Sequence, residues 1–316
     1  MRLIYTSIIF AFFITAGSLS AQQIPNLSLA QWEPYYFNPA CATSTPNAVD
    51  ISFNTRKLYS SFQDGQLINY LSVQAPLRTL HLIIGAKIMN DYFKPVNFTS
   101  ILGTIGYKFE RPAFTLSIAA DIGILNRALN YGGFIKTDQQ DKVLDNNNYL
   151  WGFSTVPDFN FGVHFKYKQT FYAGLSLMHG APFIFGNNLD YKRAIYNSLS
   201  RVYHFRTGYL YQINNNFSIE PFFISRMMET GVFQFDGGLV GNWRKMLSLG
   251  VYYRLNSSIV PMIEISPINS LKISYGFESY VNGFGTYAGY SHEFMVKYSV
   301  KLNKLVRVIE VDPRYY

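Results

Sequence analysis

The residue types that commonly perform catalysis are present in this chain, but their spacing does not build a catalytic site. Five histidines stand at positions 81, 164, 179, 204 and 292, and none of them form a zincin pair. The sequence Ser291-His292-Glu293 contains the residue types of a hydrolase triad. Neighbouring residues of a strand point to opposite faces, so these three side chains cannot meet. We interpret His164, His204 and His292 as structural or lumen residues, and we expect that the protein is not an enzyme.

Metal and phosphate sites are equally poorly supported. Asp138, Asp141 and Asp145 carry oxygen ligands that suit calcium, but their spacing differs from that of an EF-hand, which favours a solvated loop. Cys41 is the single cysteine, which excludes an internal disulfide and a cysteine-based metal cluster. The glycines of 283–285 lie outside any strand–helix unit of the kind that binds phosphate. The sequence therefore predicts no metal and no cofactor.

Composition points to a chain that shares its surface between lipid and water. The 316 residues include 27 Phe and 25 Tyr, whereas charged residues make up only 15%. The formal net charge is +8, but the basic residues are scattered through the chain and not clustered. A nucleic-acid groove is therefore the weaker interpretation, and we expect no nucleic-acid partner.

The N-terminus has the pattern of an exported protein. Arg2 is followed by a largely apolar run and then by the small residues Ser18, Ser20 and Ala21. We predict a signal peptide over residues 1–21, and a retained membrane anchor is the alternative. After it no run of 18 or more apolar residues occurs, which excludes helical membrane spans. The mature chain is therefore either a soluble exported protein or a β-barrel.

Period-two alternation favours the barrel. In residues 158–167 aromatic and apolar side chains alternate with polar ones, and 170–179 return after a tight turn, which predicts an antiparallel hairpin. Similar segments recur and predict about fourteen strands, an even number in the range of outer-membrane barrels. The predicted strands are 49–56, 66–75, 80–90, 98–109, 112–124, 158–167, 170–179, 201–212, 216–226, 231–243, 246–255, 259–266, 270–279 and 289–301. We predict an all-β transmembrane barrel over 49–301, a periplasmic segment over 22–48 and a periplasmic tail over 302–316.

The connections predict an orientation. Every second connection is tight, as at Glu110-Arg111 and Lys168-Gln169, whereas most of the others are longer, as at 125–157 and 180–200. Transmembrane barrels have short periplasmic turns and longer extracellular loops. Aromatic residues predicted to form the periplasmic girdle lie beside the short turns, namely Tyr107, Phe109, Phe114, Tyr167, Phe171, Tyr172, Tyr209, Tyr211 and Phe217.

The other face of each strand is predicted to line a polar lumen. In the strand that starts near Phe114, the alternation assigns Thr115, Ser117, Ala119 and Asp121 to this side. A Lys or Arg on the lipid face costs about 2–4 kcal/mol at mid-membrane, so basic residues within strands belong inside. The predicted lumen cations are Lys87, Lys108, Lys166, Arg206, Arg254 and Lys297.

Short motifs distributed along residues 31–300 resemble one known family. Tyr35-Tyr36-Phe37-Asn38-Pro39-Ala40 resembles the aromatic-x-Asn-Pro-Ala signature of the PorP/SprF family, outer-membrane proteins of the Bacteroidetes type IX secretion system. The chain departs from the family at 56–59, where Arg-Lys-Leu-Tyr replaces Arg-x-x-Trp. The likeness continues through Ala75-Pro76, Gly85-Ala86, Tyr172, Gly174-Leu175-Ser176, Pro221, 249–254, 272–275 and Ser291-His292-Glu293.

The resemblance implies a non-catalytic component or accessory of type IX secretion, integral to the outer membrane, that supports export or anchoring of surface proteins, including gliding adhesins. It implies as partners outer-membrane lipid, periplasmic or lipoprotein components of the machine, and secreted surface proteins. Tyr36, Asn38 and Pro39 are the predicted partner-binding residues. Two other classes stay open: a passive pore for small solutes, for which the basic lumen suggests anions, and a soluble extracellular binding sandwich.

Overall fold

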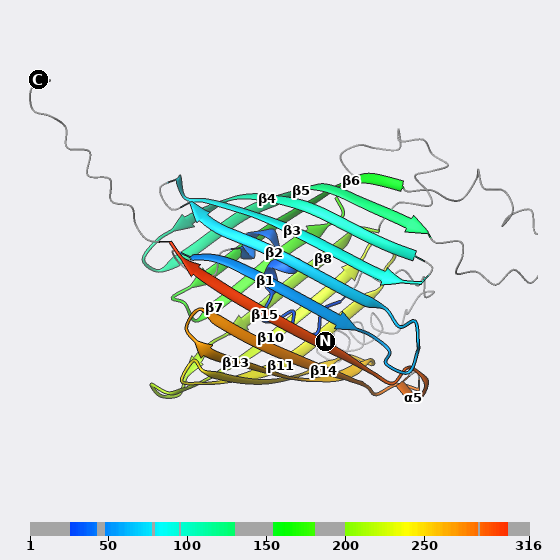
Figure 1. The fold of residues 1–316 in the computed structure, drawn as a ribbon. Coiled ribbons are helices and arrows are strands. Elements are labelled where there is room, and N and C mark those ends of the chain that lie inside the picture. Colours follow the sequence, from blue (N-terminus) through cyan, green and yellow to red (C-terminus); the bar gives the residue numbers. More distant parts are fainter. Residues whose placement is uncertain are drawn as a thin grey trace, which may run out of the picture.

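The chain forms one closed antiparallel β-barrel of 14 strands (Figure 1). The structure, a computed structural model, describes residues 26–42, 48–77, 80–94, 96–129, 154–180, 200–283 and 285–302. The predicted signal peptide, most of the C-terminal tail and Asp138, Asp141 and Asp145 lie outside these ranges. The strands are β1 (Ala48–Lys57), β2 (Leu67–Leu77), β3 (Leu82–Phe93), β4 (Val96–Glu110), β5 (Phe114–Leu129), β6 (Ser154–Tyr167), β7 (Phe171–Met178), β8 (Val202–Tyr209), β9 (Tyr211–Gln212), β10 (Phe217–Met228), β11 (Phe233–Trp243), β12 (Leu247–Arg254), β13 (Ser258–Ile268), β14 (Leu271–Tyr280) and β15 (Tyr290–Lys301).

Each strand pairs with its neighbours in the chain, and the first and last strands close the sheet. β8 and β9 flank Leu210 and both pair with β10, so they act as one strand. β1 pairs with β15 from Ala48↔Lys301 to Lys57↔His292. Closure pairs the backbone groups that an open edge would leave unpaired in hydrocarbon at several kcal/mol each. The barrel prediction is confirmed, and the soluble-sandwich alternative is wrong.

The two faces of the strands follow the predicted alternation. On β5, Ser117 and Asp121 are buried inside, whereas Ile118 and Ile122 are exposed outside. Outward aliphatic and aromatic side chains continue around the whole barrel, for example Phe53, Leu71, Ile101, Leu175, Leu239, Val251, Ile263 and Phe294. Because an apolar band of this kind is stable only against lipid, the outer surface is that of a membrane protein.

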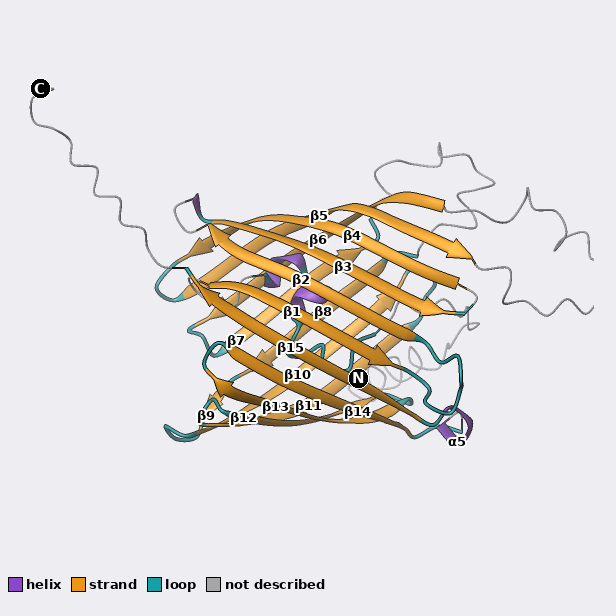
Figure 2. Cartoon of the chain, viewed as in Figure 1, coloured by secondary structure: helices purple, strands orange, loops and turns teal. Residues whose placement is uncertain are grey.

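The connections divide the barrel into two ends, which we name the turn end and the loop end. The turn end carries the connections 78–81, 111–113, 168–170, 213–216, 244–246 and 269–270. The loop end carries 58–66, 94–95, 229–232, 255–257 and 281–289, with the short helix α5 (Gly285–Ala288) in the last of these (Figure 2). The predicted loop 91–97 is shorter than expected, because the alternation continues through Phe93 and the inward Asp91 accepts a 2.8 Å hydrogen bond from Gln66.

The aromatic girdle at the turn end is confirmed for Tyr107, Phe109, Tyr167, Phe171, Tyr209, Tyr211 and Phe217, which are all exposed. The assignment of Tyr172 to the girdle is wrong, because Tyr172 follows the outward Phe171 and so faces the lumen, where it is buried. Within the described ranges, no helix has the length and apolar character that a membrane span requires.

Candidate functional site: the lumen segment

Residues 26–42, which we name the lumen segment, lie inside the barrel (Figures 1 and 2). They include two short 3-10 helices, η1 (Pro34–Tyr36) and η2 (Pro39–Cys41). Each begins with a proline, whose fixed φ favours the first helical position and which has no N–H to leave unpaired. The sequence predicts a periplasmic position for residues 22–48, whereas the structure places this part of them in the lumen.

Glu293 of β15 binds the backbone at the start of the lumen segment. Its carboxylate accepts hydrogen bonds from the N–H groups of Ser28 and Leu29, the latter at 3.1 Å. Asn54 of β1 donates to the same carboxylate at 2.6 Å. Irregular backbone inside a membrane barrel needs such partners, because water does not supply them fully there.

A chain of buried ion pairs extends from Glu293 across the wall. Arg56 lies 3.6 Å from Glu293 through Nε and also pairs with Glu278. Arg254 contacts Glu278 at 2.5 Å and Asp236 at 3.3 Å. Ser28 joins this chain through its hydroxyl, which donates to Glu278 at 3.3 Å, and through its carbonyl, which accepts from Tyr252 at 3.1 Å. The predicted basic excess of the lumen is therefore offset here by inward carboxylates.

Glu33 is the buried acidic residue of the lumen segment. It is 0% exposed, and its carboxylate lies 2.8 Å from the Lys297 ammonium. Lys297 also donates to the carbonyl of Trp32 at 3.3 Å. Gln74 of β2 donates to Glu33 at 3.4 Å. A carboxylate in this position is stable only because it is paired and hydrogen-bonded.

Tyr35 and Gln31 extend the polar contacts to the opposite wall. The Tyr35 hydroxyl is 2.5 Å from that of Thr104, which donates to Asp121. Lys87 lies 2.7 Å from Asp121 and 4.1 Å from the centre of the Tyr35 ring. Gln31 donates to the Tyr172 hydroxyl at 2.8 Å and to Glu220 at 2.7 Å. Arg206 donates to the Gln31 carbonyl at 3.0 Å and stacks over Tyr172, 4.3 Å from its ring centre.

Asn38 fixes the segment to β6 and β7. Its side-chain oxygen accepts from the Ala40 N–H at 2.9 Å and so caps η2, while its amide nitrogen donates to the carbonyls of Val163 and Leu175. Gly162 permits this approach, because a Cβ there would lie 2.0 Å from the Asn38 oxygen and 2.9 Å from Pro39. The family-like Asn-Pro-Ala motif is thus an internal anchor in this structure.

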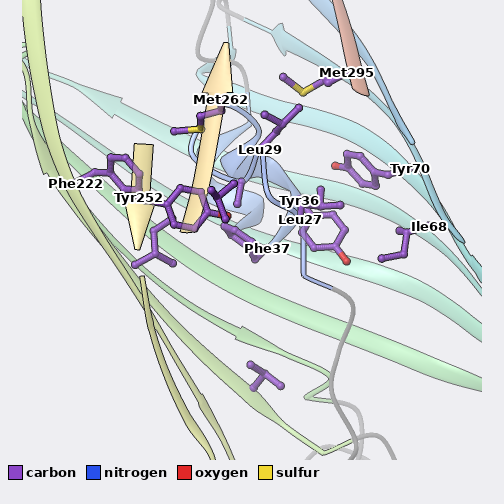
Figure 3. Close-up of a cluster of buried hydrophobic side chains, with 14 of the residues drawn as sticks. Leu27, Leu29, Tyr36, Phe37, Ile68, Tyr70, Phe222, Tyr252, Met262 and Met295 are labelled. Carbon is purple, nitrogen blue, oxygen red and sulfur yellow. The ribbon is translucent and has the colours of Figure 1, made fainter. Parts of the chain in front are cut away.

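An apolar patch of the wall packs against the lumen segment. Leu27, Leu29, Tyr36 and Phe37 face inward-pointing side chains of the strands (Figure 3), namely Ile68, Tyr70, Phe222, Tyr252, Met262 and Met295. The sequence predicts a polar lumen, but this patch of the lumen wall is apolar. The patch can be apolar because the lumen segment covers it and keeps it from water.

The predicted site residues divide into two groups in the structure. Lys87, Arg206, Arg254 and Lys297 all contact the lumen segment or the ion pairs that bind it. Lys108 and Lys166 do not join them: both are half-buried near the turn end, where Lys108 pairs with Glu110 at 2.9 Å. Tyr36, Asn38 and Pro39 are buried inside the barrel, and their role in partner binding stays a prediction.

Sequence reasoning missed the lumen position of residues 26–42 and the acidic residues that bind them. One signal was present, since inward Glu and Asp residues on strands next to inward Arg residues indicate internal pairing. The predicted inability of Ser291-His292-Glu293 to form a triad is confirmed, because Ser291 and Glu293 are buried inside while His292 is exposed outside. Among the described residues, no group of three or more metal-ligating side chains converges.

Comparisons with known proteins give one family and several distant structures. Residues 19–298 match the family described as "Type IX secretion system membrane protein PorP/SprF". Curated proteins give no match. Among solved structures, a Pseudomonas aeruginosa FadL homologue matches with a TM-score of 0.46 at 10% identity, over 90% of this chain and 96% of that one. Acinetobacter baumannii Omp33 matches with a TM-score of 0.44 at 7% identity, over 81% and 98%.

Both structural likenesses are too distant to bear on function, so the family match alone carries the assignment. It spans the lumen segment and nearly the whole barrel. Together with the closed barrel and its apolar outer band, it places the protein in the outer membrane. The chain therefore belongs to the PorP/SprF family of type IX secretion system membrane proteins.

Proposed function

We propose that this protein is a non-catalytic outer-membrane component or accessory of type IX secretion that supports the export or anchoring of surface proteins, including gliding adhesins. In this role the barrel is a scaffold, and partners bind at its turn end or at its loop end. The observation that supports the proposal most directly is that the lumen segment lies across the barrel interior and is bound to strands on opposite sides of it. A lumen obstructed by the protein's own chain suits a docking protein better than a solute channel.

A passive pore is the competing function, and the lumen disfavours it. Three of the predicted lumen cations already have carboxylate partners: Lys297 binds Glu33, Lys87 binds Asp121, and Arg254 binds Asp236 and Glu278. Reconstitution in planar bilayers tests the difference. We expect no robust ion flow from the mature protein. Stable currents that change when Lys87 or Arg254 is neutralised would establish the pore instead.

Tyr36, Asn38 and Pro39 are buried, so a partner cannot contact them directly from outside the barrel. We propose that they affect partner binding indirectly. By fixing η2, these residues set where the chain leaves the segment towards β1. We expect the double substitution Asn38→Ala with Pro39→Ala to leave the barrel folded, as judged by heat-modifiable migration in gels, but to reduce surface display of secreted cargo. Asn69→Ala is the matched control, because Asn69 lies within β2 on its outer face, outside the lumen and both sets of connections. A double variant that secretes normally would count against this role.

Mild crosslinking in the native outer membrane tests the proposal as a whole. We expect periplasmic or lipoprotein components of the secretion machine, or secreted surface proteins, to co-purify with the barrel. Recovery of a known outer-membrane neighbour shows that the crosslinking worked. If that neighbour is recovered but no such component is, the proposed secretion role is wrong.

A further inference from the structure

A cavity of about 120 Å³ lies between the lumen segment and the barrel wall. The lumen segment contributes Asn26, Tyr36 and Phe37 to its lining. The strands contribute residues close to their loop-end termini, such as Met178, the last residue of β7, and Val202, the first of β8. The cavity is therefore in the half of the lumen that faces the loop end.

One wall of the cavity presents hydrogen-bond donors that lack acceptors. Arg56 is 1% exposed, yet its Nη1 has no hydrogen-bond partner in the part of the chain that the structure describes. His204 is 5% exposed, and neither of its ring nitrogens has a partner within the described ranges. Arg226 approaches a carboxylate, that of Asp236, only at 3.7 Å. Leaving a buried donor unsatisfied costs about 1–3 kcal/mol, so these groups favour an acceptor in the cavity.

The charge of the lining is positive. Arg56, Arg226 and Arg254 face a single lining carboxylate, that of Glu278. Both Glu278 oxygens are already engaged, one by Arg254 and Ser258 and the other by Arg56 and Ser28. Burial raises the pKa of the Tyr59 phenol above its ordinary value, so this lining residue adds no negative charge. Asp236 and Glu293 lie behind the lining and pair with Arg226, Arg254 and Arg56, so the arginine charges are balanced. It is the open donor of a cationic side chain, Arg56 Nη1, beside the loosely paired Arg226 that favours an anionic acceptor, because hydrogen bonds between charged groups are the stronger ones.

One part of the remaining wall is apolar, while the neutral polar side chains of Asn26, Gln66, Gln234 and Ser257 line another part. The apolar part is formed by Phe37, Leu58, Met178, Val202, Met228 and Val232. Phe37 also stacks on His204, with ring centres 4.9 Å apart, so the apolar and polar walls adjoin. A ligand that contacts both walls has a charged head and a short hydrocarbon tail.

We propose that this cavity binds a short aliphatic carboxylate, with its head at Arg226, Arg56 and His204 and its tail towards Met228 and Val232. A guanidinium fork matches the planar carboxylate in shape and charge. Since one water-sized position takes about 10–15 Å³, the cavity accepts about eight non-hydrogen atoms, the size of hexanoate. The free acid and the carboxyl terminus of a peptide share this chemistry. The proposal does not depend on the secretion role.

Equilibrium dialysis tests the proposed carboxylate site. Radiolabelled hexanoate is dialysed against the protein in lipid nanodiscs, and empty nanodiscs serve as the blank. We expect saturable binding at one site that unlabelled hexanoate displaces and hexylamine does not. Arg226→Gln should weaken binding about tenfold or more, because it removes a charged donor to the head. Arg201→Gln should leave binding unchanged, since Arg201 pairs with Glu229 outside the cavity.

A second variant guards against misfolding of the first. Val232→Phe fills the tail end without altering any charge, and it should also weaken binding at least about tenfold while heat-modifiable migration stays normal. N-acetylglycine, which has a free carboxylate and about eight non-hydrogen atoms like hexanoate, separates the two sources: tighter binding than hexanoate indicates a peptide terminus, and weaker binding indicates a free acid. Unchanged affinity in both variants, equal competition by hexylamine, equal binding of N-acetylglycinamide, or no saturable binding would each overturn the proposal.

Discussion

At Gly162 a single hydrogen atom in place of a side chain leaves room for the Asn38 anchor. A Cβ at this position would lie 2.0 Å from the Asn38 oxygen. This steric clash could be relieved only if β6 or η2, which Asn38 caps, moved. We predict that Gly162→Val destabilises the folded barrel by about 1–3 kcal/mol, the usual cost of overpacking. Urea unfolding in lipid vesicles, followed by tryptophan fluorescence, measures the change.

Gly237 offers the matched control for that substitution. It also lies in a strand, but a Cβ there would meet no atom within 4 Å. Gly237→Val should therefore leave the unfolding free energy almost unchanged. Equal effects of the two substitutions would show that Asn38 does not depend on the space at Gly162.

The Glu33–Lys297 pair leads to a second prediction at this scale. Glu33→Gln leaves the Lys297 ammonium buried without its carboxylate, and removing one partner of a buried pair costs about 3–5 kcal/mol. We expect this loss in the unfolding free energy. The double variant Glu33→Gln with Lys297→Met should recover most of it, because no buried charge is left unpaired. Additive losses would show that the two residues do not interact.

At the scale of the strand, alternation separates the lipid face from the lumen. Ile122 of β5 is 62% exposed on the outer face, so an arginine there must enter the lipid. We predict that Ile122→Arg destabilises the barrel by about 2–4 kcal/mol, the cost near mid-membrane. Leu255→Arg, in the loop-end connection 255–257, should cost about 1 kcal/mol or less. If the two substitutions cost the same, the orientation of β5 in the membrane is wrong.

The same alternation explains how much of the fold could be predicted. Strand positions and the inward placement of Asp121 and Arg254 follow from local period two, which one stretch of sequence contains by itself. The lumen segment has no such period, and its contacts join residues far apart in the chain, such as Leu29 and Glu293 at a separation of 264. Long-range pairing of an irregular segment leaves no local pattern, so its place inside the barrel could not be predicted.

For the whole molecule, the position of the lumen segment predicts the ion conductance of a protein that lacks it. Deleting residues 26–42 removes the partners of Lys297, Arg206 and Glu293, but water then enters the lumen and solvates these charges. We expect the truncated barrel to insert into planar bilayers and to conduct ions, whereas the mature protein does not. If the truncated barrel is shown to be folded but conducts no ions, other parts of the chain close the lumen.

The chain-closing pair β1–β15 has a consequence for biogenesis. The lumen segment precedes every strand, yet Glu278 and Glu293, which bind its start, belong to the last hairpin to be synthesised. A nascent chain that ends before β14 lacks these carboxylates and the Lys297 ammonium. The contacts of the lumen segment with these carboxylates therefore form only after the last strands have been synthesised, and an incompletely translated chain lacks part of its interior packing.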